Sequence, residues 1–401
     1  MTAGLLQRLV RGGLLLVLIL APTQYSIEVG DKTYISIVDP VIWIVFALWG
    51  LGILVSKDWR TSVTPPLYVV LLIVWASISC VQATDRMTAF KEVFQLIEYF
   101  VVAYLLFRHD ARTERGLQRV ARTVLIMGCL IVYYGLIQYN LRTVESFDIG
   151  ATFGNRNVYG GYLSLMLPLI YGLALYQPGR GLRAFLLTTV AIGLGVTMSG
   201  ATFLAVSIAL GLLSIMRGPR AALLYAVALI LACTLMLPRL TRENAEVLME
   251  SISLYPDDVA VAGRYTEWQA AGYMMIENPW VGVGAGNYQK NIGQYYGVLP
   301  DPTGAAEPDI QNLYLVLGSS MGLPGLLIFV AILLCGIQRA TIVAARSHDL
   351  YTKALATGLL GAVLAFAINA LWAPLLVRGI GIPLVVILCL IDVLRARLPN
   401  N

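Results

Sequence analysis

Residues 312–338 read NLYLVLGSSMGLPGLLIFVAILLCGIQ, a run of 27 residues without one charged side chain. A helix needs about 20 such residues to cross the hydrocarbon core of a membrane. Similar apolar runs recur along the chain, at 9–24, 36–55, 66–83, 91–107, 118–139, 158–176, 184–198, 201–216, 221–237, 353–371 and 378–394. The pattern predicts an all-α polytopic membrane protein with about twelve transmembrane helices, in which residues 1–401 form a single integral membrane domain.

The composition supports this prediction. The chain is 58% hydrophobic and only 13% charged, with a mean hydropathy of +0.75. Soluble domains carry about 25% charged residues, so a soluble enzyme, a disordered protein and a disulfide-rich secreted domain are excluded. The five cysteines lie inside apolar runs and resemble buried hydrophobes more than disulfide partners or metal ligands. The net charge of +5 includes no long basic run, which argues against nucleic-acid binding.

Basic residues predict the orientation. If both termini are cytoplasmic and the chain crosses twelve times, the inner segments hold 18 of the 28 basic residues and 5 of the 23 acidic ones. The inner balance is then +13 and the outer balance −8, the asymmetry that the positive-inside rule predicts. This map places the long connection, residues 238–311, on the outer side between the ninth and tenth spans.

The long connection has helical and turn-forming parts. Helix-like patterns cover Thr241–Ser253 and Gly263–Glu277, and the second places Tyr265, Trp268, Ala271 and Met275 at helical spacing. A glycine-rich segment follows, Val281-Gly282-Val283-Gly284-Ala285-Gly286-Asn287-Tyr288, and then a turn at Pro300-Asp301-Pro302. The apolar residues of the connection predict that it packs as a lid over a cavity shared with the outer ends of the helices.

Nucleotide and metal sites have no support. The glycines at 282–286 have no preceding strand, and the chain has no Walker sequence. Neither histidine, His109 or His348, falls on the outer side, and the outer carboxylates lack the spacing of a calcium loop. We therefore expect no metal and no cofactor.

Outward-facing arginines are the main candidates for chemistry, because the guanidinium fork suits phosphate and diphosphate. They are Arg142, Arg156, Arg239, Arg242, Arg264 and Arg378. The alternative is that they anchor the membrane interface or pair with loop acids, and Arg239 and Arg242 fit that alternative better. Glu98, inside the fourth span, is a second candidate because an ionisable group is costly there. It has a structural alternative too, with Tyr99 and Tyr104 as partners.

Other polar and aromatic groups allow two interpretations. The turn at Asn155-Arg156-Asn157 fits two roles: it contributes to a binding site, or it only caps a helix. The aromatic residues of the connection fit either stacking on sugar rings or a structural role in the core of the connection or in an aromatic belt. These residues are Trp268, Trp280, Tyr288, Tyr295 and Tyr296.

Three segments together resemble the O-antigen ligase and O-antigen polymerase superfamily. Residues 150–163, GATFGNRNVYGGYL, look like its F-x-N-x-N helix start. Gly263-Arg264-Tyr265-Thr266-Glu267-Trp268, with Asn278-Pro279-Trp280 and Gly282-Val283-Gly284, is similar to its R-x-x-x-W … P-x-x-G-x-G loop. Gln311-Asn312-Leu313-Tyr314-Leu315, followed by Gly322-Leu323-Pro324-Gly325, looks like its H-N-x-Y-L … G-x-x-G helix start.

The resemblance implies a GT-C-like membrane glycosyltransferase that takes a glycan from undecaprenyl diphosphate at the periplasmic face. It implies that Arg264 grips the diphosphate, with Arg156 or Arg378 completing the clamp. A carboxylate, Asp309 first and Glu267 second, would take the acceptor's proton. Gln311 would be the catalytic-site residue at the position where the family has a His that activates or positions the acceptor. The implied glycan-binding residues are Asn157, Trp268, Tyr288, Asn312 and Tyr314. A chain-length regulator or another polysaccharide assembly protein is an implied partner.

Two departures from the family pattern bear on the activity. Gln311 stands where the family has His, and Met198-Ser199-Gly200-Ala201 stands where many members have S-R-G. The missing His argues against ligation to lipid A core and favours a polymerase, with a ligase or an inactive relative as alternatives. A twelve-helix transporter and a non-catalytic scaffold are the other classes considered. The chain lacks the two similar halves that many transporters show.

Overall fold

The computed structural model describes residues 3–23, 26–28, 34–56, 64–141, 149–197, 199–236, 259–297 and 310–399. Helices make up nearly all of it, which confirms the predicted helical class. The α-helices are α1 (Ala3–Leu20), α2 (Val38–Ser56), α3 (Leu67–Ser79), α4 (Arg86–Ile97), α5 (Tyr104–Ala111), α6 (Glu114–Leu141), α7 (Arg156–Tyr176), α8 (Arg180–Val196), α9 (Gly200–Arg217), α10 (Pro219–Met236), α12 (Val259–Glu277), α13 (Tyr288–Asn291), α14 (Leu313–Arg346), α15 (Leu350–Asn369) and α16 (Arg378–Ala396).

Short elements join these helices. The 3-10 turns are η2 (Cys80–Gln82), η4 (Ala151–Phe153) and η6 (Ile292–Tyr295), and η3 (Glu98–Ala103) is a π-helical turn between α4 and α5. Two three-residue strands, β1 (Ser26–Glu28) and β2 (Tyr34–Ser36), pair antiparallel with Ile27 opposite Ile35. Hydropathy missed this hairpin because each strand is too short to show a period.

Seven helices in the described ranges are long and apolar enough to cross a membrane: α2, α6, α7, α9, α14, α15 and α16. Residues 67–82 and 219–231 form shorter apolar helices. The remaining predicted runs fall on α1, on α8 and on the α4–η3–α5 rod, where the π turn interrupts the α-helix. The number of twelve spans therefore stays a prediction.

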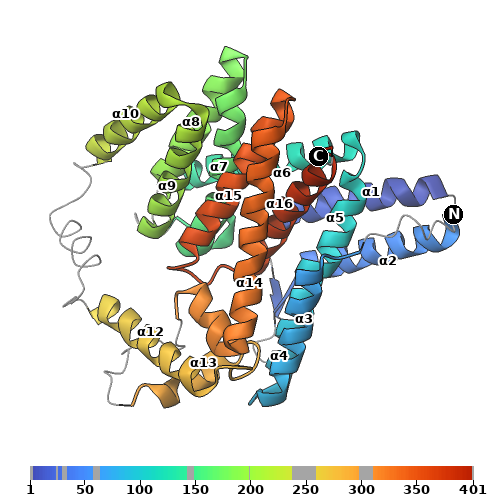
Figure 1. The fold of residues 1–401 in the computed structure, drawn as a ribbon, viewed down its shortest axis with the longest axis vertical. Helices are drawn as coiled ribbons and strands as arrows, with labels where there is room; N and C mark the ends of the chain where they lie inside the picture. Colours follow the sequence, from blue (N-terminus) through green and yellow to red (C-terminus); the bar gives the residue numbers. More distant parts are fainter. Residues whose placement is uncertain are drawn as a thin grey trace.

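The core of the bundle is formed by α7, α14, α15 and α16, which run side by side in Figure 1. Helices α7 and α15 approach each other closely. A Cβ atom on Gly172 would lie 2.3 Å from the Cα of Gly358. Small residues allow helix backbones to come this close, and packing of this kind stabilises helix pairs in membranes.

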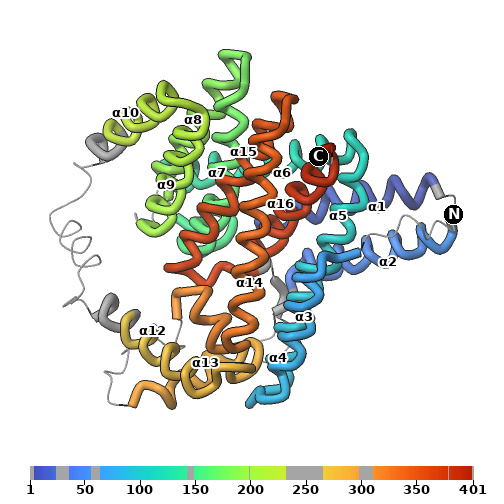
Figure 2. Tube along the Cα trace, viewed as in Figure 1, coloured from blue at the N-terminus to red at the C-terminus, as the bar shows by residue number. Residues whose placement is uncertain are grey.

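The outer parts of the bundle flank this core on two sides. Helices α1 and α2 pair along their length and leave the centre together, while α8, α9 and α10 lie on the other side (Figure 2). The described part of the long connection, α12, α13 and η6, packs at one end of the bundle against the first part of α14 (Figure 1). The predicted stretch Thr241–Ser253 and the turn at Pro300–Pro302 lie outside the described residues.

Candidate functional site

Five helix ends meet around the C-terminus of α15. Within α9, Thr202 exchanges hydrogen bonds with the buried Asn369 at the end of α15, at 3.2–3.4 Å. The backbone N–H of Leu313, at the start of α14, donates to the carbonyl of Ala370 at 2.8 Å. Gly161, near the start of α7, lies against Ile380 in the first turn of α16. The N-termini of α7, α9, α14 and α16 therefore gather at one place.

Short polar side chains cap three of these N-termini. Asn155 Oδ1 accepts the N–H groups of Asn157 and Val158 at 2.8 and 3.3 Å at the start of α7. Ser199 caps α9. Asn312 caps α14 in the same way, accepting from the N–H groups of Tyr314 and Leu315. The capping interpretation of the Asn155 turn is thus confirmed, and the Asn312 carbonyl oxygen serves the fold.

Two predicted arginines begin helices at this place. Arg156 is the first residue of α7 and is exposed, and Asn157 beside it is half-buried. Arg378 is the first residue of α16, and its side chain lies outside the described residues. Half-buried Tyr314 donates its hydroxyl to the Ala367 carbonyl at 2.7 Å, which ties α14 to α15. Gln311 is half-buried directly before the α14 cap, and Asp309 lies outside the described residues.

Helix α12 carries the other predicted catalytic residues. Its buried face holds Thr266, Glu267, Ala270, Ala271 and Met274, at helical spacing. Glu267 is only 6% exposed, which is unusual for a carboxylate in a loop helix. The sequence predicted this helix. Its buried face, however, is centred about one residue away from the helix face that the spacing of the aromatic residues indicated. Arg264 lies one turn before Glu267, and its side chain is outside the described residues.

Four of the five aromatic residues singled out in the connection pack into its own small core, whereas the fifth, Trp280, is 72% exposed. Trp268, Tyr295 and Tyr296 pack around a buried cluster that includes Tyr288 and Ile310. Tyr265 meets Trp268 edge to face at 5.9 Å between ring centroids. The loop-core interpretation is the better one for these rings. The indole N–H of Trp268 is buried without a hydrogen-bond acceptor among the described residues.

The glycine-rich segment completes a break in α14. Gly322, at φ 70°, divides this helix into two parts, so the last carbonyls of the first part lose their helical partners. The N–H groups of Val283 and Gly284 donate to the carbonyls of Ser319 and Ser320 at 2.9 and 3.0 Å.

Two further hydrogen bonds pair other backbone groups at the break. The Trp75 indole donates to the Met321 carbonyl at 2.9 Å, and the Leu323 N–H donates to the Pro279 carbonyl at 2.8 Å. Gly282 is at φ 65°, and a Cβ there would lie 2.4 Å from the carbonyl carbon of Ser320. The glycines thus allow backbone-to-backbone docking, in agreement with the exclusion of a nucleotide site.

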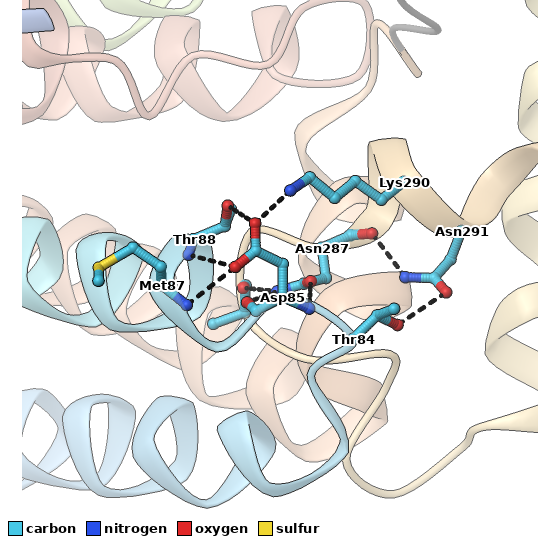
Figure 3. Close-up of polar contacts among 8 residues, drawn as sticks. Thr84, Asp85, Met87, Thr88, Asn287, Lys290 and Asn291 are labelled. Carbon is cyan, nitrogen blue, oxygen red and sulfur yellow. Dashed lines mark hydrogen bonds and ion pairs between the residues drawn. The ribbon is translucent and has the colours of Figure 1, made fainter. Parts of the chain in front are cut away.

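The same segment continues onto the turn between α3 and α4 (Figure 3). Asn287 is fully buried; its Oδ1 accepts the Asp85 N–H at 2.8 Å, and its Nδ2 donates to the carbonyls of Asp85 and Ala285. Lys290 forms an ion pair with Asp85, and Asn291 accepts a hydrogen bond from Thr84. We call this set of contacts, together with the contacts of 279–284 at the α14 break, the outer clamp.

The first part of α14 links the two groups of predicted residues. Its start rests on the end of α15, beside the starts of α7 and α16. Its body packs on α12, where Met275 lies against Gly318. The arrangement brings a helix with a buried carboxylate and a set of helix N-termini to one nine-residue segment, Leu313–Met321.

Sequence reasoning was wrong about one partner of Glu98. Glu98 is 3% exposed, and its Oε2 accepts the Trp43 indole N–H at 3.1 Å. Tyr104 instead donates its hydroxyl to Asp392. The π turn that begins at Glu98 changes which residues of this rod face the same neighbours, and spacing counted on an α-helix does not include that change.

Two well-formed cavities lie away from these residues. One, of about 800 Å³, lies among α6, α7, α8 and α15; the other, of about 590 Å³, is lined by parts of α3, α5, α14 and α16. None of the predicted site residues lines either. The predicted cavity beneath the long connection therefore stays a prediction. The part of the chain that the structure describes holds no group of three metal-ligating side chains.

Residues 184–330 match the family model described as Wzy_C, O-antigen ligase. The match begins in α8 and ends in α14, so it includes α12, the glycine-rich segment and the α14 break. A search of curated proteins finds no match. The predicted resemblance to the O-antigen ligase and O-antigen polymerase superfamily is confirmed. The family implies a glycosyltransferase-like enzyme that acts on lipid-linked glycans, and a non-enzymatic function has no support.

Proposed function

We propose that this protein polymerises undecaprenyl-diphosphate-linked oligosaccharide repeat units at the periplasmic face of the bacterial inner membrane. The observation that carries the proposal is the O-antigen ligase match over residues 184–330, the part of the chain that contains α12 and the broken α14. The product would be O-antigen or a related surface polysaccharide.

The reaction exchanges one bond to the sugar for another. An acceptor hydroxyl attacks the anomeric carbon of the donor glycan, and the bond from that carbon to the diphosphate oxygen breaks. The electron pair leaves with undecaprenyl diphosphate, and the hydroxyl proton passes to a base. Because the diphosphate is already a good leaving group, the enzyme needs chiefly cations where negative charge develops and correct positioning of the acceptor. No metal or cofactor enters this scheme.

Helix N-termini and arginines would supply the positive charge. A helix N-terminus attracts anions through its unpaired N–H groups and its dipole. Here α7 and α16 begin with Arg156 and Arg378 at the place where the starts of α9 and α14 also gather. Arg264, on α12, approaches from the long connection in this proposal and grips the diphosphate.

Glu267 is the best-supported proton acceptor among the described residues. It is buried on the face of α12 that includes Met274 and lies one turn from Arg264. Burial of a carboxylate is one way in which enzymes tune a general base. Asp309, two residues before Gln311, stays the alternative base.

The choice between polymerase and ligase rests on two different observations. Gln311 has no titratable proton and cannot replace the family's His as an acid or base, which favours the polymerase. The printed description of the matching family is a ligase, which favours transfer of the lipid-linked glycan to a final acceptor such as lipid A core.

Product size distinguishes these activities. Purified protein would be incubated with a lipid-diphosphate glycan of one repeat unit, with and without lipid A core, and the products separated by gel electrophoresis. A ladder of lengths supports the polymerase. A single transfer to the core acceptor supports the ligase, and absence of turnover with both would contradict the proposal.

Substitution of Arg264 tests the mechanism. We expect Arg264→Ala to reduce turnover by about ten- to a hundredfold, because one charge-assisted contact is worth roughly 1.5–3 kcal/mol. Arg264→Lys should recover only part of it, since an ammonium cannot make bidentate contacts. Arg86→Ala removes an exposed arginine that also begins a helix near the outer clamp, and serves as the control. Turnover of Arg264→Ala within threefold of the control would support the alternative in which Arg264 only pairs with Glu267.

A further inference from the structure

A polar cavity lies at the end of the bundle opposite the outer clamp, where the sequence predicts the cytoplasm. Its volume is about 590 Å³. It is lined by the start of α3 and by side chains from α5, α14 and α16: Thr64–Leu67, Arg108, Arg339, Asp392, Arg395 and Ala396. Three arginines and one carboxylate thus face one cavity.

Partners inside the protein already occupy the carboxylate. Asp392 is 7% exposed, and its Oδ1 forms an ion pair with Arg339. Its Oδ2 accepts the hydroxyls of Tyr68 and Tyr104 at 3.1 and 2.7 Å. We call these four residues the inner cluster. Its single negative charge balances one arginine of the cavity.

The other two arginines keep their charge uncompensated within the described residues. Arg108 donates to the Tyr104 hydroxyl at 2.7 Å, and that group is neutral. Arg395 is half-buried and forms no ion pair with a described residue. Each guanidinium has five N–H donors in a fixed fork, so most of those donors remain available. A half-buried cavity with an excess of two positive charges fits an anion with several acceptor oxygens.

The cavity opens beside a surface suited to lipid. Exposed apolar side chains follow α3 from the cavity edge in a single stripe: Leu67, Val70, Leu71, Val74 and Ile78. An acyl chain can lie along this stripe while its headgroup reaches the arginines. Basic pockets between transmembrane helices bind lipid phosphates in this way.

We propose that Arg108 and Arg395 form a binding site for a phosphate group, and that its source is the headgroup of an anionic membrane lipid. The site is separate from the proposed glycan transfer, because its residues lie at the other end of the helices. Arg339 is the positioning residue: it holds Asp392 and so leaves the other two arginines to the ligand.

Thermal unfolding of the purified full chain in detergent tests the proposal. Phosphatidylglycerol, phosphatidylcholine and sodium phosphate are each titrated, and the ligand concentration that gives a set rise in Tm, here called the midpoint, reports the affinity. We expect phosphatidylglycerol to raise the Tm progressively with concentration, and phosphatidylcholine to have little effect. In Arg108→Gln/Arg395→Gln the midpoint should move to about a hundredfold higher lipid, or about tenfold for each arginine.

Arg346→Gln is the matched control, because it removes an exposed arginine from the same end of α14 without touching the cavity. It should keep the wild-type midpoint. If the double variant does not fold, Arg395→Gln and Arg395→Lys replace it, with the lysine expected to retain part of the affinity. A rise with sodium phosphate that phosphatidylglycerol does not exceed would support the phosphate site and assign a soluble source. Equal midpoints in wild type and both arginine variants, or equal effects of the two lipids, would overturn the proposal.

Discussion

The two ends of the bundle are held together by different means. The outer clamp uses backbone groups, buried amides and one exposed ion pair, and its parts come from 79–92, 279–291 and 319–323. The inner cluster uses a buried carboxylate, a guanidinium and two phenols from four separate helices. A neutral hydrogen bond contributes only about 1 kcal/mol net, and a buried polar group left without its partner costs about 1–3 kcal/mol. Loss of one partner of a buried ion pair costs about 3–5 kcal/mol, because an uncompensated charge stays buried.

The largest effect should come from the backbone of the outer clamp. A Cβ on Gly322 would lie 2.2 Å from the Trp280 carbonyl oxygen, at a φ that side chains rarely adopt. We expect Gly322→Ala to lower the free energy of unfolding by about 3–5 kcal/mol, measured by thermal unfolding in detergent. Gly293→Ala is the control, since nothing lies within 4 Å of its Cβ position. Equal Tm values for the two variants would mean that the break does not constrain the fold.

A smaller loss is expected from the inner cluster. Arg339→Leu leaves the buried Asp392 without its counter-charge and should cost about 3 kcal/mol. The double variant Arg339→Leu/Asp392→Leu removes both charges and should be more stable than the single variant. If the double variant were the less stable of the two, the cluster would act through packing instead of charge.

Next in size is the buried amide of the outer clamp. Asn287→Ala removes three side-chain hydrogen bonds and leaves the Asp85 N–H without its acceptor, so a loss of about 2 kcal/mol is expected. Asn140→Ala, at an exposed residue with a single bond to its own helix, is the comparison. Limited proteolysis between α12 and α14 should accelerate in Asn287→Ala only. Unchanged cleavage would show that the amide does not hold the segment.

The exposed ion pair should contribute least and depend on pH. Its hydrogen bonds from Lys290, and then from Thr88, hold the pKa of Asp85 well below its ordinary value. A lowered pKa stabilises the folded state above the unfolded pKa of about 3.9, and this contribution is lost as the pH falls towards the folded pKa. The Tm advantage of wild type over Asp85→Asn should therefore be constant from about pH 7 to 5 and shrink towards pH 3. A difference that is independent of pH would assign the effect to the helix cap.

Hydropathy predicted where the apolar helices lie along the chain, but it did not predict where they are interrupted. All the predicted apolar runs fall on helices, because burial in lipid demands a continuous apolar stretch. The break at Gly322 lies inside such a run, and the sequence there differs from an intact helix only by a glycine and a nearby proline. The π turn at Glu98–Ala103 leaves no trace in hydropathy.

For the candidate site too, some features were predicted from the sequence and others were not. The apolar runs and the motifs shared with the family placed Arg156, Asn157 and Asn312 at helix starts, and the structure has them there. The burial of Glu267 and the loop core around Tyr288 depend on contacts between segments that are far apart in the chain, which no local pattern contains. The inner cluster was missed for that reason as well, although Asp392, a carboxylate near the end of an apolar run, was a visible signal.

The break in α14 sets an order for biogenesis. The carbonyls of Ser319 and Ser320 are buried, and their donors belong to a segment that the ribosome makes about 35 residues earlier. In hydrocarbon, backbone groups without partners cost several kcal/mol each. Leu313–Met321 can reach its final packing only together with the docked 279–284 segment, so the segment between α12 and α14 must fold back onto the bundle before α14 is complete.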